Sequence, residues 1–219
     1  VTLIPGIEFS TTWMGRGIHV LGLNIDIDDE TLRSGVAVQA AARRQRAELI
    51  ADRLAVAGIE HPLEAVVTLA GNSAIGRPHF ARHLVEIGAV RSVRAAFQKY
   101  LGAGKPGDVR MLWAELPDVV EWIRASGGIA VLAHPAKYGM TVTKLRALLR
   151  DFCDAGGAGI EVVCGRQDEA TTRRMATLAS DFNLAASTGS DFHTPDQHWT
   201  RPGGFPSLPL DLEPVWNRW

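Results

Sequence analysis

The chain has 219 residues, of which 46% are hydrophobic, and its formal net charge is −1 at pH 7. This composition suffices for the core of one large domain, or of a domain with a subdomain, and it excludes a disordered chain. The nearly balanced charge excludes a broadly basic surface for nucleic acid, and the two cysteines exclude a disulfide framework and a thiolate metal cluster.

The predicted elements begin with strands at Thr2–Ile7 and Gly17–Asp26. The first strand starts with neither an initiator Met nor a leader, so we expect upstream sequence to be missing. After a long helical segment, strands and amphipathic helices alternate, which is typical of layered or barrel α/β folds. The elements predicted in this last part are helix Leu116–Ala125, strand Gly128–Ala133, helix Thr143–Ala155, strand Gly159–Cys164, helix Glu169–Phe182 and strand Leu184–Thr188.

The helical segment, residues 28–113, contains no strand-like run. We predict its helices at Leu32–Ala57, Pro62–Ala70, Pro78–Ile87 and Ser92–Leu101. Helices that interrupt an alternating series indicate an inserted subdomain, usually one that lies over the site it serves. Its first helix carries several arginines, which are more often a solvated face than a phosphate-binding surface.

Polar side chains follow several predicted strands. Glu8 comes directly after the first strand, His134 ends an apolar run, and Asp191 and His193 follow a strand of small residues. In parallel α/β architectures, functional groups gather at the carboxyl ends of the strands. We therefore expect these four side chains at one edge of the fold.

His19 lies inside a strand-like run, where alternation places it opposite the apolar Ile18 and Val20. Taken singly, each histidine here is more often a hydrogen-bonded core or surface residue than a ligand. Taken together, two carboxylates and three imidazoles form the mixed nitrogen and oxygen set that suits Mn, Fe or Zn and supports more than one ion. The pattern predicts a metal site.

Candidates for binding phosphate lie in the helical segment. Pro78 suits a first helical turn, which leaves Arg77 and His79 near a positive helix N-terminus. Lys105, on the Gly-rich loop 102–107, can likewise reach an anion, although such loops are usually only turns. No serine or cysteine nucleophile motif is present, which favours a metal-bound hydroxide over covalent catalysis.

Several segments resemble, in order, the PHP-domain metal-dependent phosphoesterases. The segments are Pro5–Thr11, Ile18–Asp26, Gly76–Arg82, Tyr100–Pro106, Val131–Pro135 and Gly189–His193. Residues 24–26 and 43–54 look most like the RNase AM type, 5′-to-3′ exoribonucleases that also remove phosphate from 3′,5′-bisphosphonucleotides. The resemblance implies a distorted (β/α)7, TIM-like barrel domain formed by residues 1–27 and 114–219, with residues 28–113 as a helical insertion subdomain.

The resemblance also implies two to three divalent ions, most often Mn²⁺, with Fe²⁺ and Zn²⁺ as alternatives. By similarity, Glu8 would bridge two ions, and His19 and His134 would complete one of them. Asp191 would bind the neighbouring ion and His193 the third. The family's His-x-His and Asp-His-Asp segments, which precede these motifs, do not appear, so we expect this chain alone to lack part of the site.

The implied residue roles divide into two groups. The catalytic residues would be Glu8, His134, Asp191 and His193, and the residues that bind substrate phosphate would be Arg77, His79 and Lys105. The leading hypothesis is hydrolysis of phosphoesters in short RNA or in nucleoside 3′,5′-bisphosphates. The alternatives are a metal-dependent amidohydrolase and a non-catalytic module that binds a metal or a nucleotide.

The expected partners follow from this hypothesis and from missing signals. The substrate would be a small nucleotide or a short RNA, and no DNA-binding motif occurs. No stretch approaches the roughly 18 uncharged apolar residues of a membrane span, and a signal-peptide pattern is absent. We therefore expect a cytoplasmic protein without a membrane partner.

Overall fold

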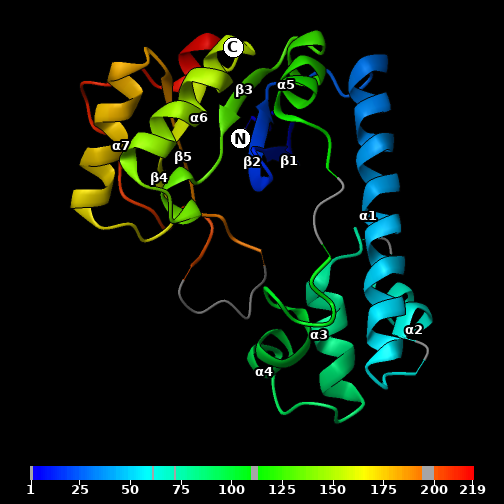
Figure 1. Cartoon of the computed structure of the whole chain (residues 1–219). Helices are drawn as coiled ribbons and strands as arrows, with labels where there is room; N and C mark the ends of the chain where they lie inside the picture. The colour runs from blue at the N-terminus through cyan, green and yellow to red at the C-terminus, as the bar shows by residue number, and fades with distance from the viewer. Residues whose placement is uncertain (1, 61, 72, 110–112, 194–199) are drawn as a thin grey trace. The chain divides into compact units, whose positions relative to one another are not determined.

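The computed structural model (Figure 1) describes residues 2–60, 62–71, 73–109, 113–193 and 200–219. The chain packs into two compact units. The first comprises Val1–Gly35 with Ala114–Trp219, and the second comprises Val36–Trp113. The domain boundaries that we derive from the sequence remain a prediction.

The first unit is built on one five-stranded sheet. Its strands are β1 (Gly6–Trp13), β2 (Arg16–Leu23), β3 (Ile129–Leu132), β4 (Gly159–Cys164) and β5 (Ala185–Gly189), in that spatial order. β1, β2 and β3 pair antiparallel, whereas β3, β4 and β5 run parallel. Met14 and Gly15 connect β1 to β2 with φ angles of 47° and 71°, the left-handed conformation that a two-residue hairpin turn of this kind requires.

Helices bury one face of this sheet. They are α5 (Leu116–Ala125), α6 (Val142–Asp154) and α7 (Glu169–Asp181). On the strands, Phe9, Ile18 and Val20 contribute to this core, and α5 contributes Val120 and Ile123. Because strand side chains alternate between faces, residues 8, 10, 19 and 21 of the hairpin point to the opposite face, where Glu8 and Leu21 line a pocket.

The predicted helices and the last four strands of this unit are confirmed within one or two residues at most bounds, but the first strand is wrong. We predicted Thr2–Ile7, and β1 spans Gly6–Trp13. The hairpin pairs all eight residues of β1 with β2, and this pairing outweighs the strand preference of residues 2–5. Glu8 therefore lies inside a strand and not at its carboxyl end.

The closed (β/α)7 barrel is not what the described residues form. They form an open sheet with β1 and β5 at its two edges. Among the residues that the structure describes, each outer edge carries a single bridge, from Thr12 to Glu115 and from Ala186 to Pro214. The fold class is therefore mixed α/β, with an antiparallel hairpin added to a parallel sheet.

The second unit consists of helices in its described residues. They are α1 (Glu30–Val56, which begins in the first unit), α2 (Pro62–Ala70), α3 (Arg77–Glu86), α4 (Val93–Ala96) and the π-helical turn η1 (Phe97–Leu101). The prediction of one helix over Ser92–Leu101 is thus partly wrong, since the segment changes from α to π. Leu54, Phe80, Leu84 and Leu101, none of them measurably exposed, form the centre of a separate core.

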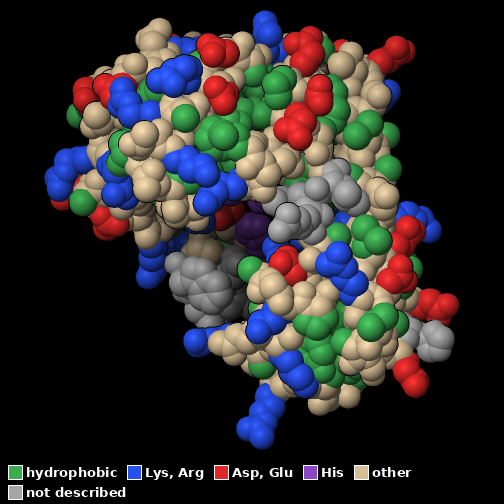
Figure 2. All heavy atoms as spheres, viewed as in Figure 1, with side chains coloured by type: hydrophobic (Ala, Val, Ile, Leu, Met, Phe, Trp, Pro, Cys, Tyr) green, Lys and Arg blue, Asp and Glu red, His purple; other side chains and the backbone are tan. Residues whose placement is uncertain are grey.

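The surface mixes charges of both signs. On the face shown in Figure 2, Lys and Arg side chains are interspersed with Asp and Glu side chains, in keeping with the net charge of −1. Among the described residues, even the 27-residue α1 lacks the apolar run that crossing a bilayer requires, and no other helix has one.

Gly35 of α1 gives a test of the packing in the first unit. A glycine inside a helix usually costs roughly 0.5–1 kcal/mol relative to alanine. At this position, however, an added Cβ would lie 2.4 Å from Cδ2 of Trp122. We therefore expect Gly35→Ala to lower the free energy of unfolding by about 1–3 kcal/mol in chemical denaturation. Ser34→Ala, at the exposed neighbour, should leave it unchanged or raise it slightly, and a stabilised Gly35→Ala variant would contradict the packing.

Candidate metal centre

Glu8 and His19 meet because of the register of the β1–β2 hairpin. Glu8 pairs with Leu21 and Ser10 pairs with His19, so the carboxylate and the imidazole are diagonal neighbours on the same face. Oε1 of Glu8 lies 2.6 Å from Nδ1 of His19. Strand pairing therefore brings together two residues that are eleven positions apart.

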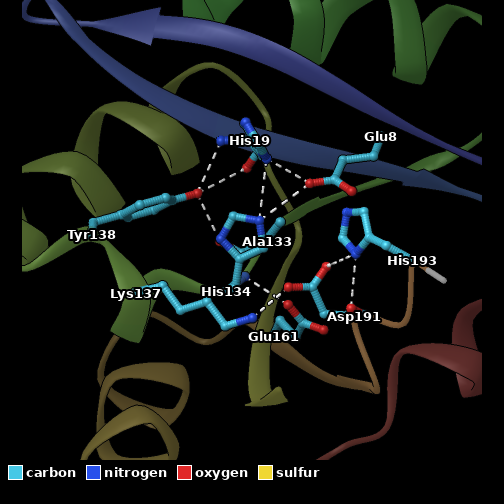
Figure 3. Close-up of polar contacts among 9 residues, drawn as sticks. All are labelled: Glu8, His19, Ala133, His134, Lys137, Tyr138, Glu161, Asp191 and His193. Carbon is cyan, nitrogen blue, oxygen red and sulfur yellow. Dashed lines mark hydrogen bonds and ion pairs between the residues drawn. The ribbon is translucent and has the colours of Figure 1, made fainter. Parts of the chain in front are cut away.

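His134 joins this pair from the end of β3. Its Nε2 lies 3.2 Å from Oε1 of Glu8 and 3.2 Å from Nδ1 of His19. Figure 3 shows the three side chains pointing toward one another. His134 adopts a left-handed conformation, with φ of 29°, and its backbone N–H donates a hydrogen bond of 2.6 Å to Oε2 of Glu161. This conformation is uncommon for residues other than glycine, so the surroundings must hold it.

The three donor atoms lie close enough together to share one divalent cation. Donors at ~2.1 Å from a shared ion lie roughly 3.0–3.4 Å apart, and the two separations that involve His134 are 3.2 Å. The separation between Glu8 and His19 is shorter, 2.6 Å, which is a hydrogen-bond distance. Glu8, His19 and His134 also form the group whose ligand atoms lie close enough for an ion among the described residues. One carboxylate and two imidazoles suit Zn, Mn or Fe.

The charges of the cluster are strongly coupled. Hydrogen bonds from His134 and from His19 hold the pKa of Glu8 well below its usual range, although burial opposes them. Burial, the largest single effect, lowers the pKa of His134, but the hydrogen bond to Glu8 and the negative charges of Glu8, Glu161 and Asp191 together outweigh it and raise the pKa above its usual value. The carboxylate is therefore ionised and attracts positive charge into the triangle.

Asp191 and His193 lie beside each other but outside this triangle. Asp191, with φ of 50°, forms an ion pair with Lys137. Nδ1 of His193 lies 2.9 Å from the backbone oxygen of Asp191 and 3.6 Å from its Oδ1. The carboxylate lines a pocket of about 350 Å³ that Glu8 and His134 also line. The roles of Asp191 and His193 as ligands stay predictions.

Three residues around the cluster escaped the sequence analysis. Glu161 is only 6% exposed and lines the same pocket; burial, the largest effect, raises the pKa of its carboxyl. The hydroxyl of Tyr138 accepts a hydrogen bond of 2.9 Å from the backbone N–H of His19 and donates one of 2.7 Å to the carbonyl of Ala133. Lys137 is the third. Of these three residues, only Glu161 can be noticed in the sequence, because it is a single carboxylate within an apolar strand.

Arg77, His79 and Lys105, the predicted phosphate-binding residues, all belong to the second unit. Arg77 opens α3, and its Nη1 lies 3.5 Å from the carbonyl of Leu101. Nδ1 of His79 accepts a hydrogen bond of 3.1 Å from the N–H of Gly76. Lys105 lies in the loop after η1. Their contact with a substrate stays a prediction.

Comparison with known proteins gives the chain its relatives. No protein-family model matches it. It is 42% identical to the 5′-3′ exoribonuclease Rnm of Escherichia coli (strain K12) over 219 residues, which cover 100% of this chain and 74% of that protein. It is 39% identical to the 3′,5′-nucleoside bisphosphate phosphatase of Chromobacterium violaceum over 218 residues, which cover 99% of this chain and 76% of that protein.

A solved structure from Chromobacterium violaceum, described as an amidohydrolase with bound sulfate and no metal, has the same fold. It matches with a TM-score of 0.88 and 39% identity, over 98% of this chain and 75% of that chain. The comparison of sequences and the comparison of structures thus both agree with the family resemblance of the motifs. The chain belongs to the family of PHP-like phosphoesterases that includes 5′-3′ exoribonucleases and 3′,5′-nucleoside bisphosphate phosphatases.

Proposed function

We propose that the protein is a metal-dependent phosphoesterase that hydrolyses phosphoester bonds of short RNA, from the 5′ end, or of nucleoside 3′,5′-bisphosphates. The observation that carries this proposal is the triangle of Glu8, His19 and His134 within a chain that is about 40% identical to enzymes with these activities. Its substrates would be small nucleotides or short RNA.

The proposed metal is Mn²⁺, with Fe²⁺ or Zn²⁺ as alternatives, and two to three ions in the intact enzyme. Glu8, His19 and His134 would hold one ion, and Asp191 and His193 would bind the neighbouring ions. When bound, such ions polarise the phosphoryl group and supply a hydroxide nucleophile at neutral pH. The proposal is supported by the donor distances and by the pocket that the carboxylate of Asp191 shares with the triangle.

The polar residues around the triangle would keep it in place. Glu161 fixes the backbone of His134, and the ion pair with Lys137 holds the carboxylate of Asp191 at the edge of the pocket. We further propose that the open sheet is part of the distorted (β/α)7 barrel, that residues 28–113 are an insertion into it, and that Arg77, His79 and Lys105 bind substrate phosphate.

Hydrolysis is tested with the full-length protein and Mn²⁺, by measuring phosphate released from adenosine 3′,5′-bisphosphate and nucleotides released from a short 5′-phosphorylated RNA. We expect Glu8→Ala to lower both rates by at least about 100-fold, because it removes the donor atom shared by the triangle. Glu121→Ala, which removes an exposed carboxylate on α5, is the matched control. Turnover no faster than that of Glu8→Ala would refute the proposal.

Metal binding is tested separately from turnover, by titrating Mn²⁺ and following the electron paramagnetic resonance signal of the free ion. His19→Ala and His134→Ala should each weaken binding by at least about 10-fold, since each removes one of three donors. His79→Ala, in the second unit, should bind as the unchanged protein does. Equal affinity in all three variants would mean that the triangle does not hold the ion.

Tyr138 is proposed as a positioning residue, because its hydroxyl joins the backbones of the two strands that carry the histidines. Tyr138→Phe keeps the ring, which packs edge-on against His134 with centroids 5.5 Å apart, and leaves the N–H of His19 unpaired. We expect about a 10-fold lower kcat and weaker Mn²⁺ binding with KM nearly unchanged. If Tyr138→Phe lowers stability but keeps normal metal affinity and kcat, the hydroxyl is only structural.

A metal-dependent amidohydrolase is the second candidate, favoured by the description of the matched Chromobacterium violaceum structure. It would use the same triangle to activate water against a carbonyl carbon. Cleavage of cyclic amides with no release of phosphate from the substrates above would select this function.

A further inference from the structure

Two arginines of α1 do not lie on a solvated face. Cζ of Arg43 and Cζ of Arg46 lie 5.3 and 5.5 Å from the ring centroid of Trp113, so one indole holds both guanidinium groups by cation–π contact. Both arginines are half-buried. Arg44 differs, since its side chain is 81% exposed and pairs with Glu48. The sequence expectation of a solvated arginine face therefore holds for Arg44 only among these three.

Arg77 adds a third positive charge to the group. Burial, followed by the charges of Arg77 and of Arg43, lowers the pKa of the Arg46 guanidinium to about 10. Asp108 opposes this effect, but its carboxylate accepts a hydrogen bond from Gly104. Within the described part of the chain, Arg46 and Arg77 form no ion pair with a carboxylate; both donate weakly to backbone carbonyls, at 3.4 and 3.5 Å.

The space beside Arg43 and Arg46 is small. A cavity of about 10 Å³ is lined by these two arginines, by Gly76, the residue before Arg77, and by Trp113, together with apolar side chains. This volume admits about one oxygen-sized atom. Gly76 is the N-cap of α3, a ten-residue helix whose N-terminus adds partial positive charge. Gln39, one turn before Arg43 on α1, is 6% exposed, and its amide has no hydrogen-bond partner in the described structure.

We propose that Arg43, Arg46 and Arg77 form a phosphate-binding site within the helical unit, with Trp113 as the aromatic surface that holds two of the guanidinium groups. Guanidinium groups crowded together repel one another unless an anion lies between them, and their planar donor pairs match phosphate oxygens. The identity of the anion as a phosphate of the RNA or nucleotide substrate rests on the proposed function. The proposal that this site binds an anion does not depend on the proposed function.

Binding is measured by calorimetry in EDTA, so that no turnover occurs, with three probes: inorganic phosphate, a 5′-phosphorylated trinucleotide and its 5′-hydroxyl counterpart. Arg43→Met and Arg46→Met keep the apolar stem against Trp113 but remove the charge. We expect each to weaken binding of the phosphorylated trinucleotide by about 10- to 100-fold and to reduce the slope of log affinity against log salt by about one. Arg44→Met, on the same helix, is the matched control and should change neither value.

The three probes distinguish the possible anions. Weaker binding of both inorganic phosphate and the trinucleotides supports a general phosphate site, and weaker binding confined to the trinucleotides supports a site for the RNA backbone. In turnover with Mn²⁺, the same variants should raise KM and leave kcat within about twofold. If both variants bind all three probes as Arg44→Met does, the site does not exist.

Further variants separate a loss of the phosphate site from a loss of stability and from a failure of the proposed function. If Arg46→Met unfolds at a clearly lower temperature, two other variants replace it. They are Arg77→Met, at the arginine whose guanidinium lies over Phe97, and Arg46→Lys, which keeps the charge but loses the planar donor pair. Each should weaken binding. Loss of binding in these variants would support the phosphate site even if the unchanged protein hydrolysed no phosphoester, so the two ideas fail separately.

Discussion

A single carboxylate oxygen of Glu8, shared by two imidazoles, sets the requirements for the rest of the first unit. The two ring nitrogens that face it also face each other at 3.2 Å. Such an arrangement is favourable only if a proton or a cation lies among the three atoms, because lone pairs would otherwise point at one another. The surrounding structure must hold three donor atoms at these distances without a covalent connection between them.

Strand pairing and buried hydrogen bonds meet this requirement together. The β1–β2 register fixes Glu8 relative to His19. Tyr138 and Glu161 bond to the backbone of the two residues that follow β3, Ala133 and His134. Tyr138 spans 119 residues of sequence to reach His19. The helices on the opposite face contribute indirectly, because they bury the apolar half of the same hairpin and so keep its register.

The sequence predicted the composition of the site better than its construction. The motifs in the sequence identified Glu8, His19 and His134, which lie together in the structure. The predicted pattern of strands and helices is also largely confirmed. We expected the carboxyl ends of parallel strands to gather these residues, whereas an antiparallel hairpin supplies two of them. The antiparallel direction of these two strands follows from the two-residue turn at Met14 and Gly15, which periodicity alone does not encode.

The roles of other residues depend on their environment, which the sequence does not show. Glu161 stands in a strand whose other residues are buried, and its role follows from the N–H of His134, 27 residues away. The arginines of α1 have identical chemistry but different surroundings, and only the position of Trp113 separates Arg43 and Arg46 from Arg44. A helical repeat predicts which faces exist but not what covers them.

The left-handed backbone of His134 and of Asp191 has a consequence for how the protein can change. Glycine adopts this conformation with little strain, so replacement of either residue by glycine relieves backbone strain while it removes a side chain of the candidate site. Selection for thermal resistance alone would therefore favour variants that fold better but lack one side chain of the candidate site. At both positions the residue that is present opposes the conformational preference of the chain.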